Sequence, residues 1–416
     1  MSNKILKFPK DFLWGVSTSA YQIEGGTAND WSQWEKSEKR IKKLRRKDKN
    51  PDDFICGLAC DSYHRYEEDA RLVKDLNCGA YRLGIEWARI EPKEGKWNFK
   101  EVEHYRKVLQ NLKDNNLKVV LTLWHWTNPI WLSSMGGWSN KKVVDYFSRY
   151  TKFIAQELGD LVDYWIILNE PMVHIAGGYI TGKFPPNRKL IFLARKVFNN
   201  LVKAHKMGYN IIHNKYPEAK VSITKLTNYF EPAHAWCPVG AGLAKIVAWF
   251  WNKRFLNKIK NELDFIGLDY YFHDRIVWYP PFKKNKNYRL GGVGERITDM
   301  GWEIYPEGIY HVLKSLAKFK KPIIIIENGL ADAKDEKRAD FIRQHLKYVH
   351  KAISEGMDVR GYFHWSLLDN FEWAEGFGPK FGLYGVDRKT FKRTARPSVK
   401  VYAEICKNDR VVISNL

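Results

Sequence analysis

Residues 322–329 (PIIIIENG) constrain the fold more strongly than any other stretch of this sequence. Four consecutive isoleucines predict a β-strand that is buried on both faces, as the strands of a parallel sheet are. The Asn-Gly pair that follows predicts a turn, which places Glu327 at the carboxyl end of the strand. In a parallel α/β barrel this end of the strands faces the active site, so Glu327 is a candidate catalytic carboxylate.

A second segment, residues 164–171 (YWIILNEP), follows the same pattern. Its aromatic and branched residues predict a strand that again stops on a glutamate, Glu170. Pro171 cannot donate a further ladder hydrogen bond, so the strand should end there. We expect Glu170 and Glu327 to occupy equivalent positions at the tips of two strands.

Strand-like and helical segments alternate along the whole chain. The strands are expected at residues 12–17, 80–87, 118–123, 164–170, 220–225, 264–271, 322–327 and 359–365. The helices are expected at residues 62–76, 100–115, 141–158, 190–216, 243–260, 305–319 and 336–355. Strands that alternate with helices indicate a parallel sheet, and eight such units close a barrel.

We therefore predict the α/β class, with residues 1–416 forming a single (β/α)8 TIM barrel as one domain. The alternative is an open doubly wound sheet, which would need a glycine-rich turn after the first strand. Gly15, Gly25 and Gly26 do not provide that motif.

Composition narrows the cellular context. No stretch approaches the 18 or so uninterrupted apolar residues of a membrane span, and residues 1–9 lack the apolar core of a signal peptide. A cytoplasmic location is expected.

Five cysteines are an odd number spread over the chain, which favours reduced thiols. Cys56, Cys60 and His64 could contact a metal from one helix, but no second pair of ligands completes a zinc site.

The net charge of +22 would attract polyanions or anionic lipid surfaces, and its densest cluster spans residues 36–49. The simplest interpretation of this segment is a solvated loop, and the alternative is contact with an anionic membrane surface. Residues 249–255 (WFWNKRF) could belong to the core, to the wall of the site or to such a surface patch. No nucleic-acid-binding motif is present, so no specific nucleic acid is expected.

Short motifs are spread over nearly the whole chain, at residues 12–15 (FLWG), 22–25 (QIEG), 86–90 (EWARI), 125–126 (HW), 169–171 (NEP), 300–302 (MGW), 327–329 (ENG) and 365–373 (WSLLDNFEW). Together they resemble the motifs of glycoside hydrolase family 1, the retaining β-glycosidases. The compact length and the pair His364-Trp365 are most similar to the archaeal-type members. The sequence departs from the family pattern at four positions. Asp269 replaces an asparagine, Ile167 and Ile326 replace threonines, and Thr127 replaces an aspartate.

The resemblance implies that two carboxyl groups have different catalytic roles. Glu170 would be the acid/base and Glu327 the nucleophile of a double displacement through a covalent glycosyl-enzyme, with the carboxyl groups about 5–5.5 Å apart. Arg82 would keep the nucleophile ionised, and Tyr271 would donate a hydrogen bond to it. Since side chains perform these steps alone, no cofactor and no metal are expected.

The resemblance also implies a set of substrate-binding residues, whose donors and acceptors suit sugar hydroxyls and whose indole rings suit sugar faces. Trp365 would form the floor under the glycone, and Trp302 the platform for the leaving group. Glu372 argues for an unphosphorylated glycone, because a carboxylate would repel a phosphate. The expected binding residues are Gln22, His125, Trp126, Asn169, Trp302, Trp365, Glu372 and Trp373.

Two functional hypotheses follow. The first is a retaining β-glycosidase that removes the non-reducing-end β-D-glycosyl unit from small-molecule β-glycosides or oligosaccharides, with β-glucosides expected before β-galactosides or β-mannosides. The second is a non-catalytic barrel that binds carbohydrate or an anionic surface. Loss of catalysis would normally appear as a changed glutamate, and both glutamates are present. The sequence does not determine the oligomeric state.

Overall fold

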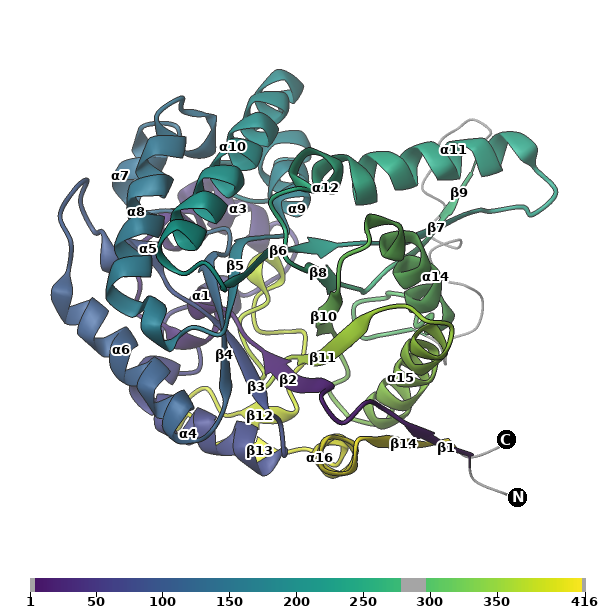
Figure 1. Cartoon of the computed structure of the whole chain (residues 1–416). Coiled ribbons are helices and arrows are strands. Elements are labelled where there is room, and N and C mark those ends of the chain that lie inside the picture. Colours follow the sequence, from purple (N-terminus) through teal and green to yellow (C-terminus); the bar gives the residue numbers. More distant parts are fainter. Residues whose placement is uncertain (1–3, 278–296, 414–416) are drawn as a thin grey trace.

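A computed structural model describes residues 4–277 and 297–413, whose centre is a closed barrel of eight parallel strands (Figure 1). Around the barrel the strand order is β10-β11-β2-β3-β4-β5-β6-β8. Their bounds are β2 (Leu13–Ser17), β3 (Ala80–Gly84), β4 (Lys118–Trp124), β5 (Tyr164–Asn169), β6 (Lys220–Leu226), β8 (Ile266–Asp269), β10 (Ile323–Asn328) and β11 (Val359–Trp365). The predicted TIM barrel and all eight predicted strands are confirmed.

Alternate residues of the strands face two different cores. Ile324 and Ile326 of β10 pack inside the barrel, in a cluster that includes Ile166 of β5 and Phe363 of β11. Ile323 and Ile325 belong to the outer core, between the barrel and its helices. Apolar side chains on both faces are the reason that this segment consists of four isoleucines in succession.

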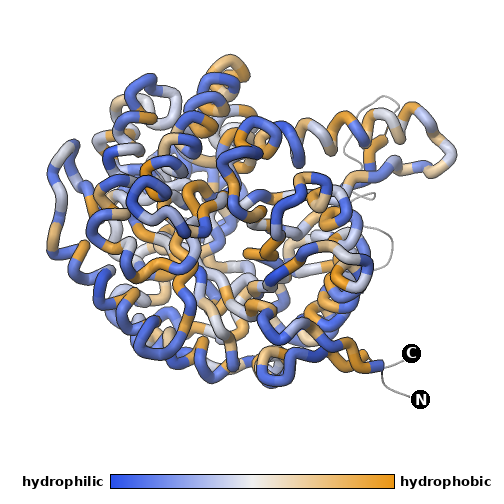
Figure 2. The backbone as a smooth tube through the Cα atoms, viewed as in Figure 1, coloured by the Kyte–Doolittle hydropathy of each residue, from blue (hydrophilic) through white to orange (hydrophobic). Residues whose placement is uncertain are grey.

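Amphipathic helices form the outer layer, and Figure 2 shows hydrophobic and hydrophilic residues alternating along them. The helices that connect the barrel strands are α4 (Ser62–Asp75), α6 (Phe99–Asp114), α8 (Val143–Leu158), α10 (Ile191–Lys215), α11 (Pro238–Ala248), α12 (Arg254–Ile259), α14 (Glu307–Leu316) and α15 (Arg338–Ser354). After β11 the chain forms α16 (Ser398–Asn408). Residues 243–260, predicted as one helix, comprise the end of α11, a π-helical turn η5 (Trp249–Lys253) and α12.

Short elements complete the fold. The helices are α1 (Ala20–Glu24), α2 (Asp30–Glu35), α3 (Glu38–Arg45), α5 (Trp87–Ile90), α7 (Ile130–Ser134) and α9 (Pro171–Ile175). Two-stranded sheets pair β1 (Lys4–Lys7) with β14 (Arg410–Ile413), β12 (Tyr384–Val386) with β13 (Arg393–Ala395), and β7 (Tyr229–Pro232) with β9 (His273–Ile276). The β1–β14 pair brings the two ends of the described chain together (Figure 1).

The structure corrects the interpretation of residues 36–49 as a loop, because α3 occupies most of this segment. Glu38 lies in the first turn of α3, and Lys42, Lys43 and Arg45 lie in the last. This distribution complements the helix dipole and explains why so basic a segment forms a helix. The side chain of Leu44 is buried and anchors the helix to the rest of the protein.

All five cysteines are free thiols, as predicted. Cys56 and Cys60 are buried, and each thiol lies within hydrogen-bond distance of a backbone carbonyl. The side chain of His64 is 70% exposed and contacts Asp61 at 2.6 Å, so these three residues do not form a metal site. In the described ranges, no helix is long and apolar enough to span a bilayer.

Candidate active site

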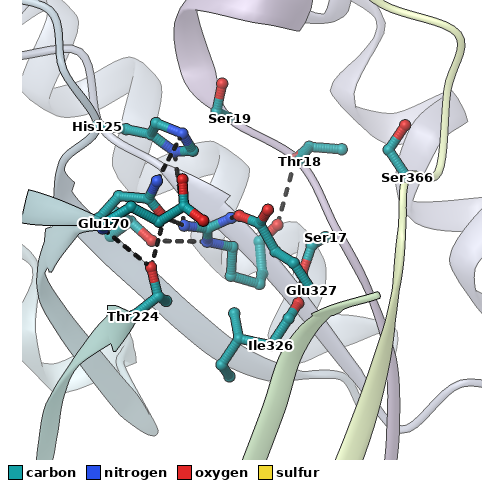
Figure 3. A network of polar contacts seen from close by, with 12 residues as sticks. Ser17, Thr18, Ser19, His125, Glu170, Thr224, Ile326, Glu327 and Ser366 are labelled. Atoms are coloured by element: carbon teal, nitrogen blue, oxygen red, sulfur yellow. Dashed lines mark hydrogen bonds and ion pairs between the residues drawn. The ribbon is translucent and has the colours of Figure 1, made fainter. Parts of the chain in front are cut away.

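The two glutamates meet at the carboxyl ends of the barrel strands. Glu170 follows β5 directly, and Glu327 is the next-to-last residue of β10. Both are buried, with 6% and 5% of their surface exposed. Figure 3 shows the two side chains reaching the same polar network from different strands. One carboxyl oxygen of each lies within 4.8 Å of the other, and an oxygen of Asp269 completes this cluster.

Local backbone features aim both side chains into the pocket. Glu170 has a left-handed backbone (φ 41°), and its N–H donates to the carbonyl of Thr224 at 3.1 Å, which fixes the turn before Pro171. In β10 the pairing with β8 is irregular between Ile325 and Glu327. Ile326 faces the barrel interior, so a regular strand would turn Glu327 outward. The irregularity re-aims Glu327 toward the pocket, as bulges near active sites commonly do.

Glu327 receives two strong hydrogen bonds. Nη1 of Arg82 donates to Oε1 at 2.5 Å, and the hydroxyl of Tyr271 donates to Oε2 at 2.9 Å. Burial raises the pKa of Glu327, and Arg82 and Tyr271 oppose that rise by stabilising the ionised form. Arg82 is itself fully buried on β3, where its Nε donates to Thr122 at 2.8 Å. Arg82 and Tyr271 thus both contact Glu327, and their expected roles in catalysis stay predictions.

Glu170 lies in a different electrostatic environment. Burial, followed by the negative charge of Glu327, raises the pKa of Glu170 to about 8. Lys225 and Arg82 lower it by a smaller amount. Among the described residues the carboxyl oxygens of Glu170 accept no hydrogen bond of the kind that Glu327 receives. At neutral pH this arrangement favours a protonated Glu170 beside an ionised Glu327.

Asp269 and Lys225 are two further buried ionisable groups that the sequence reasoning did not place in the site. Both are fully buried at the ends of β8 and β6. Burial, followed by the negative charges of Glu327 and Glu170, raises the pKa of Asp269 well above its ordinary value, against the opposing effects of Arg82 and of a hydrogen bond with Thr224. Burial lowers the pKa of Lys225 to about 7, against the opposing effect of Glu170. A lysine at the carboxyl end of the predicted strand 220–225 was the signal that could have identified it.

The carboxyl cluster opens into a cavity of about 330 Å³. Nine of the predicted site residues line it, namely Glu170, Glu327, Tyr271, His125, Trp126, Trp302, Trp365, Glu372 and Trp373. The wall also includes residues that the sequence reasoning did not assign to the site, among them Lys183, Phe184, Met300, Glu375 and Phe381. These lie on loops whose approach to the barrel depends on tertiary packing.

Three predicted residues lie behind the wall and contact the residues that form it. Arg82 contacts Glu327, as described above. Asn169 accepts from the guanidinium of Arg82 and from the hydroxyl of Thr224, and its amide nitrogen lies 2.9 Å from Nε2 of His125. Gln22 donates to the carbonyl of Phe371 at 2.8 Å and to Glu372 at 3.5 Å. The roles of these side chains in binding a sugar stay predictions.

Aromatic rings form most of the remaining wall. Trp302 and Tyr271 pack against a buried cluster that contains Trp365 and Phe381. On the opposite side, the ring of Trp373 lies 4.7 Å from that of Trp126 and 5.5 Å from that of His125. Such rings can stack on the apolar faces of a pyranose while the carboxyl groups bind its hydroxyls. Burial raises the pKa of Glu372 to about 8, so this side chain can donate as well as accept.

In the described part of the chain, the carboxyl cluster is also the one group of at least three acidic, histidine or cysteine side chains close enough to ligate a metal ion. Arg82, and Lys225 in its protonated form, place positive charge against the same cluster. These charges oppose the binding of a cation there, so the donor set fits acid/base chemistry better than a metal centre.

Comparisons with known proteins agree with this geometry. The sequence model described as "Glycosyl hydrolase family 1" matches residues 5–240 and 245–411. The chain is 34% identical to the "1,4-beta-D-glucan glucohydrolase" of Thermotoga neapolitana, over 97% of this chain and 99% of that protein. It is 30% identical to the "Beta-galactosidase" of Pyrococcus woesei, over 97% and 98% respectively. The structure of a "beta-glycosidase from Pyrococcus horikoshii" has a TM-score of 0.88 and 37% identity, and covers 98% of this chain and 96% of its own.

Proposed function

Because the chain belongs to glycosyl hydrolase family 1, we propose that it is a retaining β-glycosidase of unphosphorylated β-D-glycosides, with β-glucosides as its preferred substrates. That it is a glycoside hydrolase follows from the family itself. The retaining stereochemistry, the glycone preference and the roles of individual residues are the content of the proposal.

In the first step of the proposed mechanism, a carboxylate oxygen of Glu327 attacks the anomeric carbon and forms an ester as the glycosidic bond breaks. Glu170 gives its proton to the departing oxygen. Esterification removes the negative charge of Glu327, which is one of the causes of the high pKa of Glu170. Glu170 is then a stronger acid, so it stays ionised after losing its proton and can accept one from the attacking water. The ester is hydrolysed, and both carboxyl groups return to their starting states.

The observation that carries this proposal is the short distance between the two carboxyl groups. Their oxygens approach within 4.8 Å. Retaining enzymes place the two groups about 5–5.5 Å apart, and inverting enzymes place them about 6.5–9.5 Å apart to leave room for a water molecule. The unequal hydrogen bonding of the pair supports the assignment of roles, because only Glu327 is bonded to both a guanidinium and a phenol.

The glycone assignment rests on the acidic character of the pocket and on the names of the relatives. Glu372 lines the cavity and would repel a phosphorylated sugar, whereas its carboxyl group can bind hydroxyls. A glucan glucohydrolase and a β-galactosidase are both among the similar proteins. We place β-glucosides first because the glucohydrolase is the more similar of the two. No observation favours a barrel that binds sugar without cleaving it.

Two measurements test the proposal. Proton NMR during hydrolysis of an aryl β-glucoside should show the β-anomer of glucose first, with the α-anomer appearing only by mutarotation. Glu327→Gln should lower kcat by more than about a thousandfold while the thermal melt shows a folded protein. Initial release of the α-anomer, or unchanged turnover by the variant, would refute the mechanism.

A further inference from the structure

The basic segment of residues 36–49 has no part in the chemistry described above, yet it adjoins the site. Arg40, Lys43 and Leu44 of α3 line a separate cavity of about 170 Å³, together with Lys47 and Lys49 from the loop that follows. This basic cavity shares Lys183, Ala374 and Glu375 with the wall of the catalytic cavity.

The basic cavity is strongly cationic. Five positive side chains line it against one carboxylate, that of Glu375; the five are Arg40, Lys43, Lys47, Lys49 and Lys183. Within residues 4–277 and 297–413, no carboxylate forms an ion pair with any of the four lysines. Their charge is therefore available to a ligand.

Two of the cations are fixed in place by the protein. The guanidinium of Arg40 donates to the carbonyl of Ala374 at 2.5 Å and lies 4.5 Å from the centre of the Trp34 ring. The ammonium of Lys49 lies 4.9 Å from the centre of the Phe54 ring. These contacts distinguish the two side chains from lysines and arginines that extend freely into solvent. Positioned cations lose less conformational entropy when an anion binds than mobile ones do.

A third cavity, of about 850 Å³, joins the other two. It shares Met300, Trp302 and Glu375 with the catalytic cavity, and Lys49, Phe54 and Glu375 with the basic cavity. The buried carboxyl groups mark the end where the glycone would bind, so a leaving group must extend outward past Trp302. The basic cavity lies on that outward side, beside the exposed carboxylate of Glu375.

We propose that the basic cavity is a leaving-group subsite, which selects β-glycosides whose aglycone carries an anionic group such as a carboxylate, a sulfate or a phosphate. The proposal rests on the proposed function, because it needs a glycone bound at the carboxyl cluster. Its physical basis is the separation of charge along the path of the substrate. Acidic groups surround the uncharged sugar, and cations lie where the substituent of the leaving group would arrive.

A matched pair of substrates isolates this effect. One is the β-glucoside of 4-methylumbelliferone that carries an acetic acid side chain at position 3, and the other is its uncharged primary amide. The two leaving groups differ in charge far from the bond that breaks. At low ionic strength the wild type should cleave the carboxylate with a kcat/KM about two- to fivefold higher, the range expected for exposed ion pairs. Sodium chloride should reduce the ratio toward one.

Charge-matched variants within residues 36–49 separate the effect of the cavity from that of the net charge of +22. Lys43→Gln/Lys47→Gln removes two positive charges from the cavity wall and should abolish the preference. Lys39→Gln/Lys42→Gln removes two charges from side chains that do not line the cavity and should keep it. All four lysines are exposed, so both variants should fold. The ratio of kcat/KM for the two substrates is taken within each variant, which cancels any change of activity common to both.

Three outcomes would overturn the proposal: equal kcat/KM of the wild type for the two substrates, equal loss of the preference in both variants, and binding of the segment to vesicles of anionic phospholipid without any substrate preference. Lys43→Glu/Lys47→Glu offers a second readout, since reversed charge should make the amide the better substrate. Failure of the proposed function gives a different result, in which neither substrate is cleaved.

Discussion

Removal of one hydroxyl group tests how Glu327, the proposed nucleophile, stays ionised. In Tyr271→Phe, Glu327 loses the 2.9 Å hydrogen bond to its Oε2 but keeps Arg82. A hydrogen bond to a charged group contributes about 1.5–3 kcal/mol. One pKa unit corresponds to about 1.4 kcal/mol, so the acidic limb of kcat/KM should move up by about one to two pH units. The direction is upward because the lost donor favoured the ionised form of Glu327.

The assay is the pH dependence of kcat/KM for an aryl β-glucoside, measured from about pH 3 to pH 9. Tyr270→Phe is the matched control, since the hydroxyl of Tyr270 is also buried but donates to the carbonyl of Tyr305 at 2.8 Å, away from both glutamates. It should leave the acidic limb where it is. An unmoved limb in Tyr271→Phe, or equal shifts in both variants, would show that the phenol does not control the ionisation of Glu327.

Two further variants test buried charges. Lys225→Met removes a group whose positive charge lowers the pKa of Glu170, so the basic limb of kcat/KM should move up. Because the pKa of Lys225 is about 7, the side chain is only partly charged on that limb, and the shift should be less than about one unit. A basic limb that stays or falls would contradict this reasoning. Asp69→Asn breaks a buried ion pair in which Asp69 lies 3.0 Å from Arg393, and urea unfolding should show a loss of about 3–5 kcal/mol. Asp358→Asn breaks an exposed ion pair with Arg360 and should lower the free energy of unfolding by less than about 1 kcal/mol. Equal losses of stability in the two variants would contradict the role of burial.

The barrel could be predicted because the amino-acid composition of its strands indicates that they are buried. Four isoleucines in residues 323–326 leave no polar face, so the strand must be covered on both sides, and the same argument applies to residues 165–168. The two glutamates were visible for a related reason. An ionisable residue directly after such a run is costly to bury among apolar side chains, so it marks the end of the apolar core, and a turn or a proline fixes the end of the strand there.

Other parts of the site depend on contacts that local sequence does not encode. The place of Lys225 beside Glu170 depends on the register between β5 and β6, and that of Asp269 on the register between β6 and β8. The irregularity that turns Glu327 into the pocket lies within a uniform run of isoleucines, which gives no sign of it. The basic segment was predicted as a loop because its charges suggested solvation, whereas its contact with Ala374 bridges residues 334 positions apart.

The distribution of protons explains why two similar glutamates would take different roles in the proposed mechanism. Burial raises the pKa of Glu170, Glu372 and Asp269, so these groups favour their neutral forms near neutral pH. Burial acts on Glu327 in the same direction, and what distinguishes it is the pair of donors on its two oxygens. In the proposed mechanism, the nucleophile is therefore selected by its hydrogen-bond donors and not by its depth in the barrel. An acid in the position of Glu170 would attack poorly because it keeps its proton, and for the same reason it can protonate the leaving group.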